Sequence, residues 1–139
     1  WLAILLALFT TFLSGFLVNL LFGQAYQEAS AVLAIQIWGG VFVFIGVASG
    51  IFFTAENYTR KVFYRTALGA VSNVLLNIII IPLYGIYGAA LATLTSQFIA
   101  NVAYDFFDND VQEILAIKMK SFFPIVYFKR AVNEVFKKS

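Results

Sequence analysis

The stretch NIIIIPLYGIYGAALATLTSQFIAN, residues 77–101, carries no charged residue, yet it contains two asparagines, a proline and two glycines. The uncharged region around it extends over residues 66–104. One membrane crossing needs about 20 apolar residues, so this region is too long for one crossing and about right for two. Pro82 interrupts the helical hydrogen-bond ladder, and the glycines that follow can turn the chain. The pattern predicts two helices that are joined by a turn beginning at Pro82.

Two more uncharged regions, residues 1–27 and 29–55, come before this one, and each fits one crossing. Across the chain 62% of residues are hydrophobic and 12% are charged, against about half and a quarter in soluble domains. The sequence therefore predicts an all-α integral membrane protein. Its four transmembrane helices are expected at about residues 1–22, 29–55, 66–82 and 86–105, within a membrane domain 1–107 that is followed by a tail, 108–139.

The basic residues predict the orientation. All nine lysines and arginines lie in residues 60–65 or after Asp105, and four crossings place these two segments on one side of the membrane. The positive-inside rule makes that side the cytoplasm, so we expect an inner (plasma) membrane protein with a cytoplasmic C-terminus. Arg60, Lys61 and Arg65 are predicted to set this topology or to contact lipid headgroups. In the tail, apolar residues recur at helical spacing and predict a short amphipathic helix on the membrane surface, with a solvated tail as the alternative.

Small and polar residues follow helical stripes inside the predicted spans. Asn73 and Asn77 are four residues apart and share a face with Gly69, and Gly46 and Gly50 have the GxxxG spacing of close helix contacts. Such stripes can pack helices together through interhelical hydrogen bonds, or they can line a hydrated path for sugar hydroxyls or headgroup oxygens. The residues predicted for packing or turning are Gly46, Gly50, Gly69, Pro82, Gly85, Gly88, Ala92 and Ser96. The candidates for a substrate path are Gln36, Asn73, Asn77, Gln97 and Asn101.

Residue types that carry catalysis or bind metals are scarce. The chain has no histidine and no cysteine, and Glu28, Glu56 and Asp105 stand only at the ends of the spans. Acid–base chemistry and metal binding draw on such groups, so we expect no catalytic site, no metal, no cofactor and no enzymatic activity. Coupling to a proton or sodium gradient would need an ionisable group outside these spans.

Residues 73–93, NVLLNIIIIPLYGIYGAALAT, resemble the penultimate helical hairpin of bacterial polysaccharide flippases, which translocate lipid-linked O-antigen and capsule oligosaccharides. LLFGQAYQEASAVLAIQIWG, residues 20–39, is similar to their segment between spans nine and ten. SQFIANVAYDFF (96–107) and QEILAIKMKSFF (112–123) look like the end of span twelve and the start of the tail. The pieces occur in the family's order over about residues 15–125.

The resemblance implies membership of the multidrug/oligosaccharidyl-lipid/polysaccharide exporter superfamily. This chain would supply spans nine to twelve, part of a six-helix lobe in a twelve-helix transporter that works by alternating access. The substrate would be undecaprenyl-diphosphate-linked oligosaccharide, and the partners would be membrane lipid, the remaining helices and other polysaccharide-assembly proteins, without nucleic acid. The residues that match the family motif would be architectural: Asn77, Pro82, Gly85, Gly88, Ala89, Ala92 and Thr93.

Three alternatives stay open. A multidrug-exporter-like cation antiporter would share the fold, a polysaccharide polymerase would share the biosynthetic setting, and a small non-transport subunit would share the four helices. Because the chain opens on Trp1 and its first apolar run has no basic flank, we expect the C-terminal portion of a longer protein.

Overall fold

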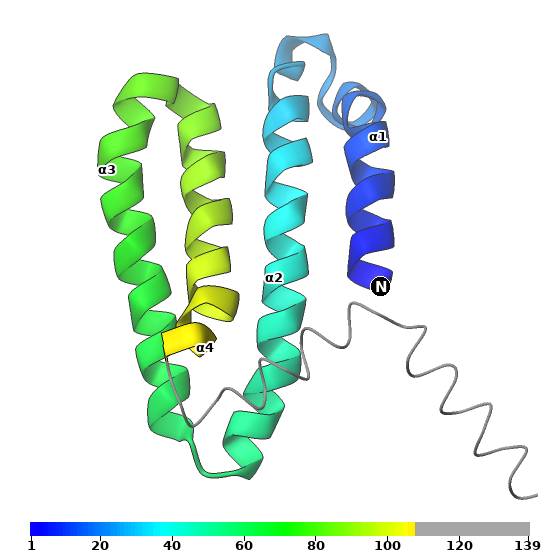
Figure 1. The fold of residues 1–139 in the computed structure, drawn as a ribbon. Helices are drawn as coiled ribbons and strands as arrows, with labels where there is room; N and C mark the ends of the chain where they lie inside the picture. Colours follow the sequence, from blue (N-terminus) through cyan, green and yellow to red (C-terminus); the bar gives the residue numbers. More distant parts are fainter. Residues whose placement is uncertain (108–139) are drawn as a thin grey trace, which may run out of the picture. The chain divides into compact units, whose positions relative to one another are not determined.

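The structure, a computed structural model, describes residues 1–107 (Figure 1). The chain divides into two compact units, Trp1–Tyr104 and Asp105–Ser139. All long elements are helical, as predicted. The predicted amphipathic tail helix and the domain 108–139 lie outside the described residues. The elements are α1 (Leu2–Phe22), the 3-10 turn η1 (Gln24–Tyr26), α2 (Ala29–Ala55), α3 (Thr59–Phe98), the π-helix η2 (Ile99–Ala103) and α4 (Tyr104–Phe107).

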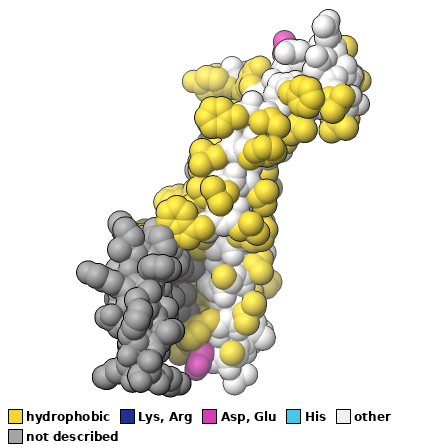
Figure 2. All heavy atoms as spheres, turned by 90° about the vertical axis from the view of Figure 1, so that its right-hand side faces the viewer, with side chains coloured by type: hydrophobic (Ala, Val, Ile, Leu, Met, Phe, Trp, Pro, Cys, Tyr) yellow, Lys and Arg dark blue, Asp and Glu magenta, His cyan; other side chains and the backbone are white. Residues whose placement is uncertain are grey.

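Three helices within residues 1–107 are long and apolar enough to cross a membrane: Leu2–Phe22, Ala29–Ala55 and Thr59–Phe107. Their large apolar side chains point outward, with Phe12 84% exposed and Ile51 71% exposed. Figure 2 shows apolar side chains spread over the face that it presents, with the acidic side chains near its two ends. Soluble proteins avoid so large an apolar surface. The expectation of a helical membrane protein is therefore supported, whereas the count of four crossings stays a prediction.

The third long helix reverses direction. Residues 73 and 96 would be about 35 Å apart on a straight helix, but Asn73 Nδ2 lies 3.1 Å from Ser96 Oγ. The reversal occurs at Gly85, the residue inside α3 with non-helical angles (φ 57°, ψ −132°), and Figure 1 shows the two antiparallel arms that result. Below, the first arm is the part of α3 before Gly85, and the second arm runs from there through η2.

The predicted end of the helix at Pro82 was wrong by about one turn. Helical structure continues through Pro82, and the break comes three residues later at Gly85. Proline removes one backbone donor and crowds the preceding turn, which weakens the helix. A positive φ, however, is readily adopted by glycine and not by leucine or tyrosine, so the reversal takes place where glycine stands. The first arm also begins earlier than predicted, at Thr59 instead of residue 66.

Two glycines allow the arms to lie close together. A Cβ built on Gly88 would come within 2.6 Å of the Ile80 backbone oxygen, and one on Gly69 within 2.7 Å of the Ala100 Cβ. Both contacts are shorter than any real side chain tolerates, so only glycine permits this spacing. The arms therefore meet through backbone and small side chains at these two places, and Gly69 and Ala100 also line a cavity between the arms.

Helix α2 lies between α1 and the hairpin, and it contacts both α3 and η2. The face of α2 toward the second arm carries glycines and aromatics: Phe42 packs edge-on against Phe98, with 5.4 Å between ring centroids. In Figure 1 the loop between α2 and α3 lies at the same end of the bundle as the end of the second arm. The predicted orientation requires these two segments to lie on the same side of the membrane. The choice of the cytoplasm as that side stays a prediction.

Candidate functional site: a polar cavity between the arms of α3

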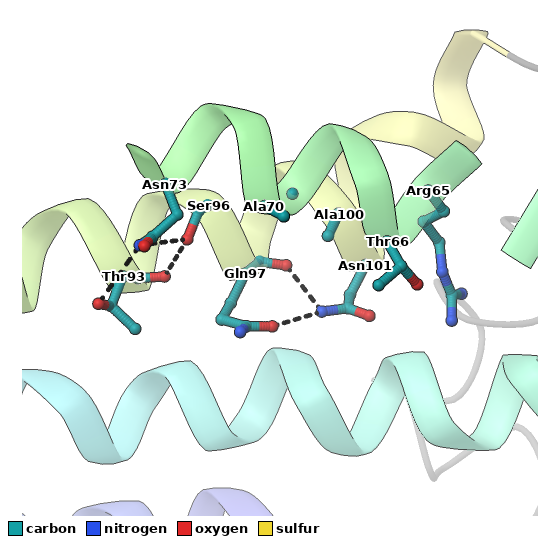
Figure 3. Close-up of a pocket in the computed structure, with 10 residues that line it drawn as sticks. Arg65, Thr66, Ala70, Asn73, Thr93, Ser96, Gln97, Ala100 and Asn101 are labelled. Carbon is teal, nitrogen blue, oxygen red and sulfur yellow. Dashed lines mark hydrogen bonds between the residues drawn. The ribbon is translucent and has the colours of Figure 1, made fainter. Parts of the chain in front are cut away.

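A cavity of about 330 Å³ lies in the α3 hairpin, within the size range of small-molecule sites (Figure 3). Both arms contribute to its wall, and most of its polar groups are uncharged amides and hydroxyls. Such groups can donate and accept hydrogen bonds without the cost of burying a charge. We call it the polar cavity, and its lining residues are Arg65, Thr66, Gly69, Ala70, Asn73, Thr93, Ser96, Gln97, Ala100 and Asn101.

Asn73 joins the two arms across the cavity. Its Nδ2 donates to Ser96 Oγ at 3.1 Å and, more weakly, to Thr93 Oγ1 at 3.5 Å. Figure 3 shows the three side chains converging from the two arms. The predicted packing role and the predicted path role of Asn73 are thus compatible, because the side chain bonds across the hairpin and lines the cavity at once.

Asn77 lies one turn beyond Asn73 and does not line the cavity. Its Nδ2 donates to Asn73 Oδ1 at 3.0 Å. Its Oδ1 is buried and has no hydrogen-bond partner among the described residues. A buried acceptor without a donor costs about 1–3 kcal/mol. The structure therefore places Asn77 behind the cavity as support for Asn73, at a local cost in stability.

Gln97 and Asn101 lie one turn apart on the second arm and face α2. Asn101 Nδ2 donates to the Gln97 backbone oxygen and to Gln97 Oε1, each at 3.0 Å. Asn101 belongs to the π-helix η2, a form of helix that is rare and often found at functional sites. A Cβ on Gly46 of α2 would overlap Asn101 Oδ1, so α2 approaches this side chain as closely as glycine allows.

Arg65 forms one end of the cavity and is 6% exposed. Its Nη1 donates to Ser49 Oγ at 2.9 Å and its Nη2 to the Gly46 backbone oxygen at 3.1 Å. The guanidinium also lies over the Phe53 ring, 5.3 Å from its centroid. The geometry thus gives Arg65 a role in joining α3 to α2, which the prediction of a topology or headgroup residue did not include.

The other predicted residues lie away from the cavity. Gln36 is exposed on α2, and Arg60 is exposed at the start of α3. Lys61 Nζ lies 5.0 Å from the centroid of the Tyr58 ring. Gly50 lies near Arg65, since a Cβ there would be 3.8 Å from Nη2. The structure brings together Asn73, Gln97 and Asn101 from the candidate path and leaves Gln36 outside it.

Sequence reasoning missed the partners of Arg65 on α2. Gly46, Ser49 and Phe53 stand at positions i, i+3 and i+7, and all three are buried. This spacing places them on one helical face, and the signal was present in the stripe that starts with the GxxxG pair. Thr66, a further lining residue, was also missed, although it stands three residues before Gly69 and seven before Asn73, on the same helical face. Among residues 1–107 no group of three or more His, Cys, Asp or Glu side chains could hold a metal ion.

Two curated proteins resemble the chain. An uncharacterized membrane protein of Methanocaldococcus jannaschii is 28% identical over 149 aligned positions, which cover 96% of this chain and 28% of that protein. The capsular polysaccharide biosynthesis protein CapF of Staphylococcus aureus is 34% identical over 97 residues, which cover 69% of this chain and 24% of that protein. No family model matches the chain, and no solved structure does.

These relations and the apolar helices define the class: the chain is a membrane protein. It has a distant relative in capsular polysaccharide biosynthesis. The chain spans about a quarter of the length of each of these two relatives.

Proposed function

We propose that the chain provides four membrane crossings of a transporter that flips lipid-linked oligosaccharide across the inner membrane. The crossings would be α1, α2 and the two arms of α3, because each arm is longer than the about 17 residues that suffice for one crossing. With four crossings, the basic residues at 60–65 and in the tail lie on the cytoplasmic side.

The observation that carries the proposal is the polar cavity inside an otherwise apolar hairpin. A group that crosses the membrane must exchange its hydrogen bonds with water for hydrogen bonds with protein, since the lipid offers none. Neutral amides and hydroxyls on both arms supply such partners for sugar hydroxyls. The relation to a capsular polysaccharide biosynthesis protein supports a saccharide as the cargo. Undecaprenyl diphosphate as the lipid carrier, alternating access and a twelve-helix whole remain parts of the proposal.

The test is a flipping assay in lipid vesicles with the whole transporter that contains this chain. The vesicles contain a fluorescent undecaprenyl-diphosphate-linked oligosaccharide, and an impermeant glycosidase is added outside. In protein-free vesicles about half of the lipid is protected, and with an active flippase all of it becomes accessible within minutes. Protection that stays at the protein-free level, with a helical and fully inserted protein, would refute the proposal.

A matched pair of variants connects flipping to the cavity. Ala70→Phe adds a ring to a lining residue, whereas Val71→Phe adds the same ring to the next residue, which does not line the cavity and is exposed. We expect the first variant to slow flipping strongly and the second to flip at the wild-type rate. Equal rates for the two variants would show that the cargo does not pass through the polar cavity.

A further inference from the structure

The hydrogen bonds around Asn73 determine which of its amide atoms faces which neighbour. Thr93 Oγ1 donates to the Ala89 backbone oxygen at 2.9 Å, and Ser96 Oγ donates to the Thr93 backbone oxygen at 2.8 Å. Each hydroxyl has one hydrogen, so both oxygens can only accept from Asn73, which must present Nδ2. The Thr66 hydroxyl likewise donates its hydrogen to the Val62 backbone oxygen at 2.8 Å. The hydroxyl oxygens that line the cavity are therefore acceptors.

The same reasoning fixes the side chain of Gln97. The Gln97 backbone oxygen can only accept, so Asn101 must present Nδ2 to it. The second hydrogen of that Nδ2 goes to the Gln97 side chain, which must present Oε1. Gln97 Nε2 is consequently turned away from Asn101, as Figure 3 shows, and neither of its hydrogens is donated to another of residues 1–107.

The polar cavity therefore offers two kinds of partner. The oxygens of Thr66, Thr93 and Ser96 can accept from ligand hydroxyls, each through a lone pair that is still available. Gln97 Nε2 offers two N–H donors, and Arg65, at one end, has donors only. A ligand that bonds to both the acceptors and the donors carries hydroxyl groups, which can donate, together with an oxygen that has no hydrogen and can only accept a hydrogen bond.

Building on the proposed function, we propose that Gln97 is a specificity-determining residue that donates from Nε2 to a carbonyl-type oxygen on a sugar. That oxygen belongs to an N-acyl group or to a carboxylate. Asn101 is the positioning residue, because its two hydrogen bonds hold the Gln97 amide in this orientation. The π-helix places Asn101 against Gly46, which leaves no space for the side chain to turn away.

The test measures binding of four monosaccharides to the full chain in lipid nanodiscs by ligand-observed NMR. The probes are N-acetylglucosamine and glucuronate, which carry the acceptor oxygen, and glucose and glucosamine, which do not. We expect N-acetylglucosamine, glucuronate or both to bind about tenfold more tightly than glucose, the size of one well-placed hydrogen bond. The two acceptor probes separate a neutral carbonyl from a carboxylate. No binding of any probe, or equal binding of all four, would overturn the inference.

Three isosteric variants assign the effect to residues. Gln97→Glu replaces the donor by an acceptor and should abolish the preference for N-acetylglucosamine over glucose. Asn101→Asp removes the donor that holds Gln97, so the Gln97 amide should turn over and favour glucosamine, whose ammonium donates. Loss of packing alone would weaken all probes equally and would not reverse the preference. Gln36→Glu, at an exposed site on α2, is the matched control and should leave the preference unchanged.

The vesicle assay separates this inference from the proposed function. If flipping occurs and Gln97→Glu leaves both the sugar preference and the binding unchanged, Gln97 does not select the ligand, although the transport proposal stands. If the full chain binds N-acetylglucosamine through Gln97 but flips no lipid, the recognition site stands and the transport proposal fails.

Discussion

Asn73 Nδ2 donates to Ser96 Oγ at 3.1 Å, a hydrogen bond between residues 23 positions apart that joins the two arms of α3. The bond is partly buried between the two arms, and lipid chains offer no group that could replace either partner. This hydrogen bond determines which faces of the two arms meet. Apolar contacts alone specify the facing of helices only weakly in lipid.

Replacing Asn73 by leucine should therefore destabilise the hairpin. The change leaves Ser96 Oγ and the Asn77 amide without their partner, and we expect a loss of about 1–2 kcal/mol in the free energy of unfolding. The measurement is SDS-driven unfolding in mixed micelles, followed by circular dichroism. Asn19→Leu, on an exposed position of α1, is the matched control and should change stability by less than about 0.5 kcal/mol. Equal effects of the two changes would contradict the assigned role.

A methyl group at Gly46 should separate α2 from the second arm. The added Cβ would overlap Asn101 Oδ1, so Gly46→Ala is expected to cost about 1–3 kcal/mol in the same unfolding measurement. Gly40→Ala is the control, because nothing lies within 4 Å of a Cβ there. The double variant with Asn101→Ala should recover part of the loss. If the two losses simply add, the contact between these residues is not the cause.

Gly85 should not tolerate a side chain. Its φ of 57° with ψ of −132° is a conformation that L-residues rarely adopt, so Gly85→Ala should lower stability by about 1–3 kcal/mol. Gly15→Ala, in the helical part of α1 with open space around the new methyl, should be neutral or slightly stabilising. The amount of inserted protein and its unfolding midpoint are the measurements. A fully stable Gly85→Ala variant would show that the reversal does not depend on this backbone conformation.

Arg65 should contribute to stability more than its position near a helix end suggests. Arg65→Ala removes two charge-assisted hydrogen bonds to α2 and the contact with the Phe53 ring. We expect a loss of about 2–3 kcal/mol in the free energy of unfolding, since hydrogen bonds to charged groups are the stronger ones. Arg60→Ala, which removes an exposed arginine, should have little effect. A similar loss in both variants would point to a general effect of charge and not to these contacts.

The chain contains no cysteine, so single introduced cysteines report topology without background. We expect Glu56→Cys, in the loop between α2 and α3, to react with an impermeant maleimide only from the cytoplasmic side. Tyr84→Cys, beside the reversal at Gly85, should react only from the opposite side. Labelling of both cysteines from one side would exclude two crossings by α3.

Much of the fold could be predicted because lipid imposes simple rules on sequence. The boundaries expected for the first two helices agree with α1 and α2 to within one residue, since charges and turn residues mark their ends clearly. The reversal was expected between residues 82 and 86, with Gly85 as one of two turning glycines, and it occurs at Gly85; the predicted helix end at Pro82 was wrong. A proline weakens a helix wherever it stands, whereas a reversal needs a residue that can adopt the required angles, and Gly85 was one of two candidates.

The site was harder to predict because periodicity fixes the face of a residue and not its partner. Asn73 and Gln97 were chosen as candidates, and both line the cavity, but Gln36 had the same residue type in the same kind of helix and is exposed. The π-helix carries no sequence mark, and without it the relation of Asn101 to Gly46 could not be anticipated. Arg65 was assigned from its charge, and its contacts with α2 depend on a crossing geometry that the sequence does not specify.

The π-helix at Ile99–Ala103 holds one residue more per turn than the α-helix around it. A single-residue deletion inside this turn would relax it to α-helix and remove the extra residue. The same deletion within α2 would rotate everything that follows by about 100°. The deletion in the π-helix would instead act locally, because Asn101 lies inside that turn and would lose its position against Gly46.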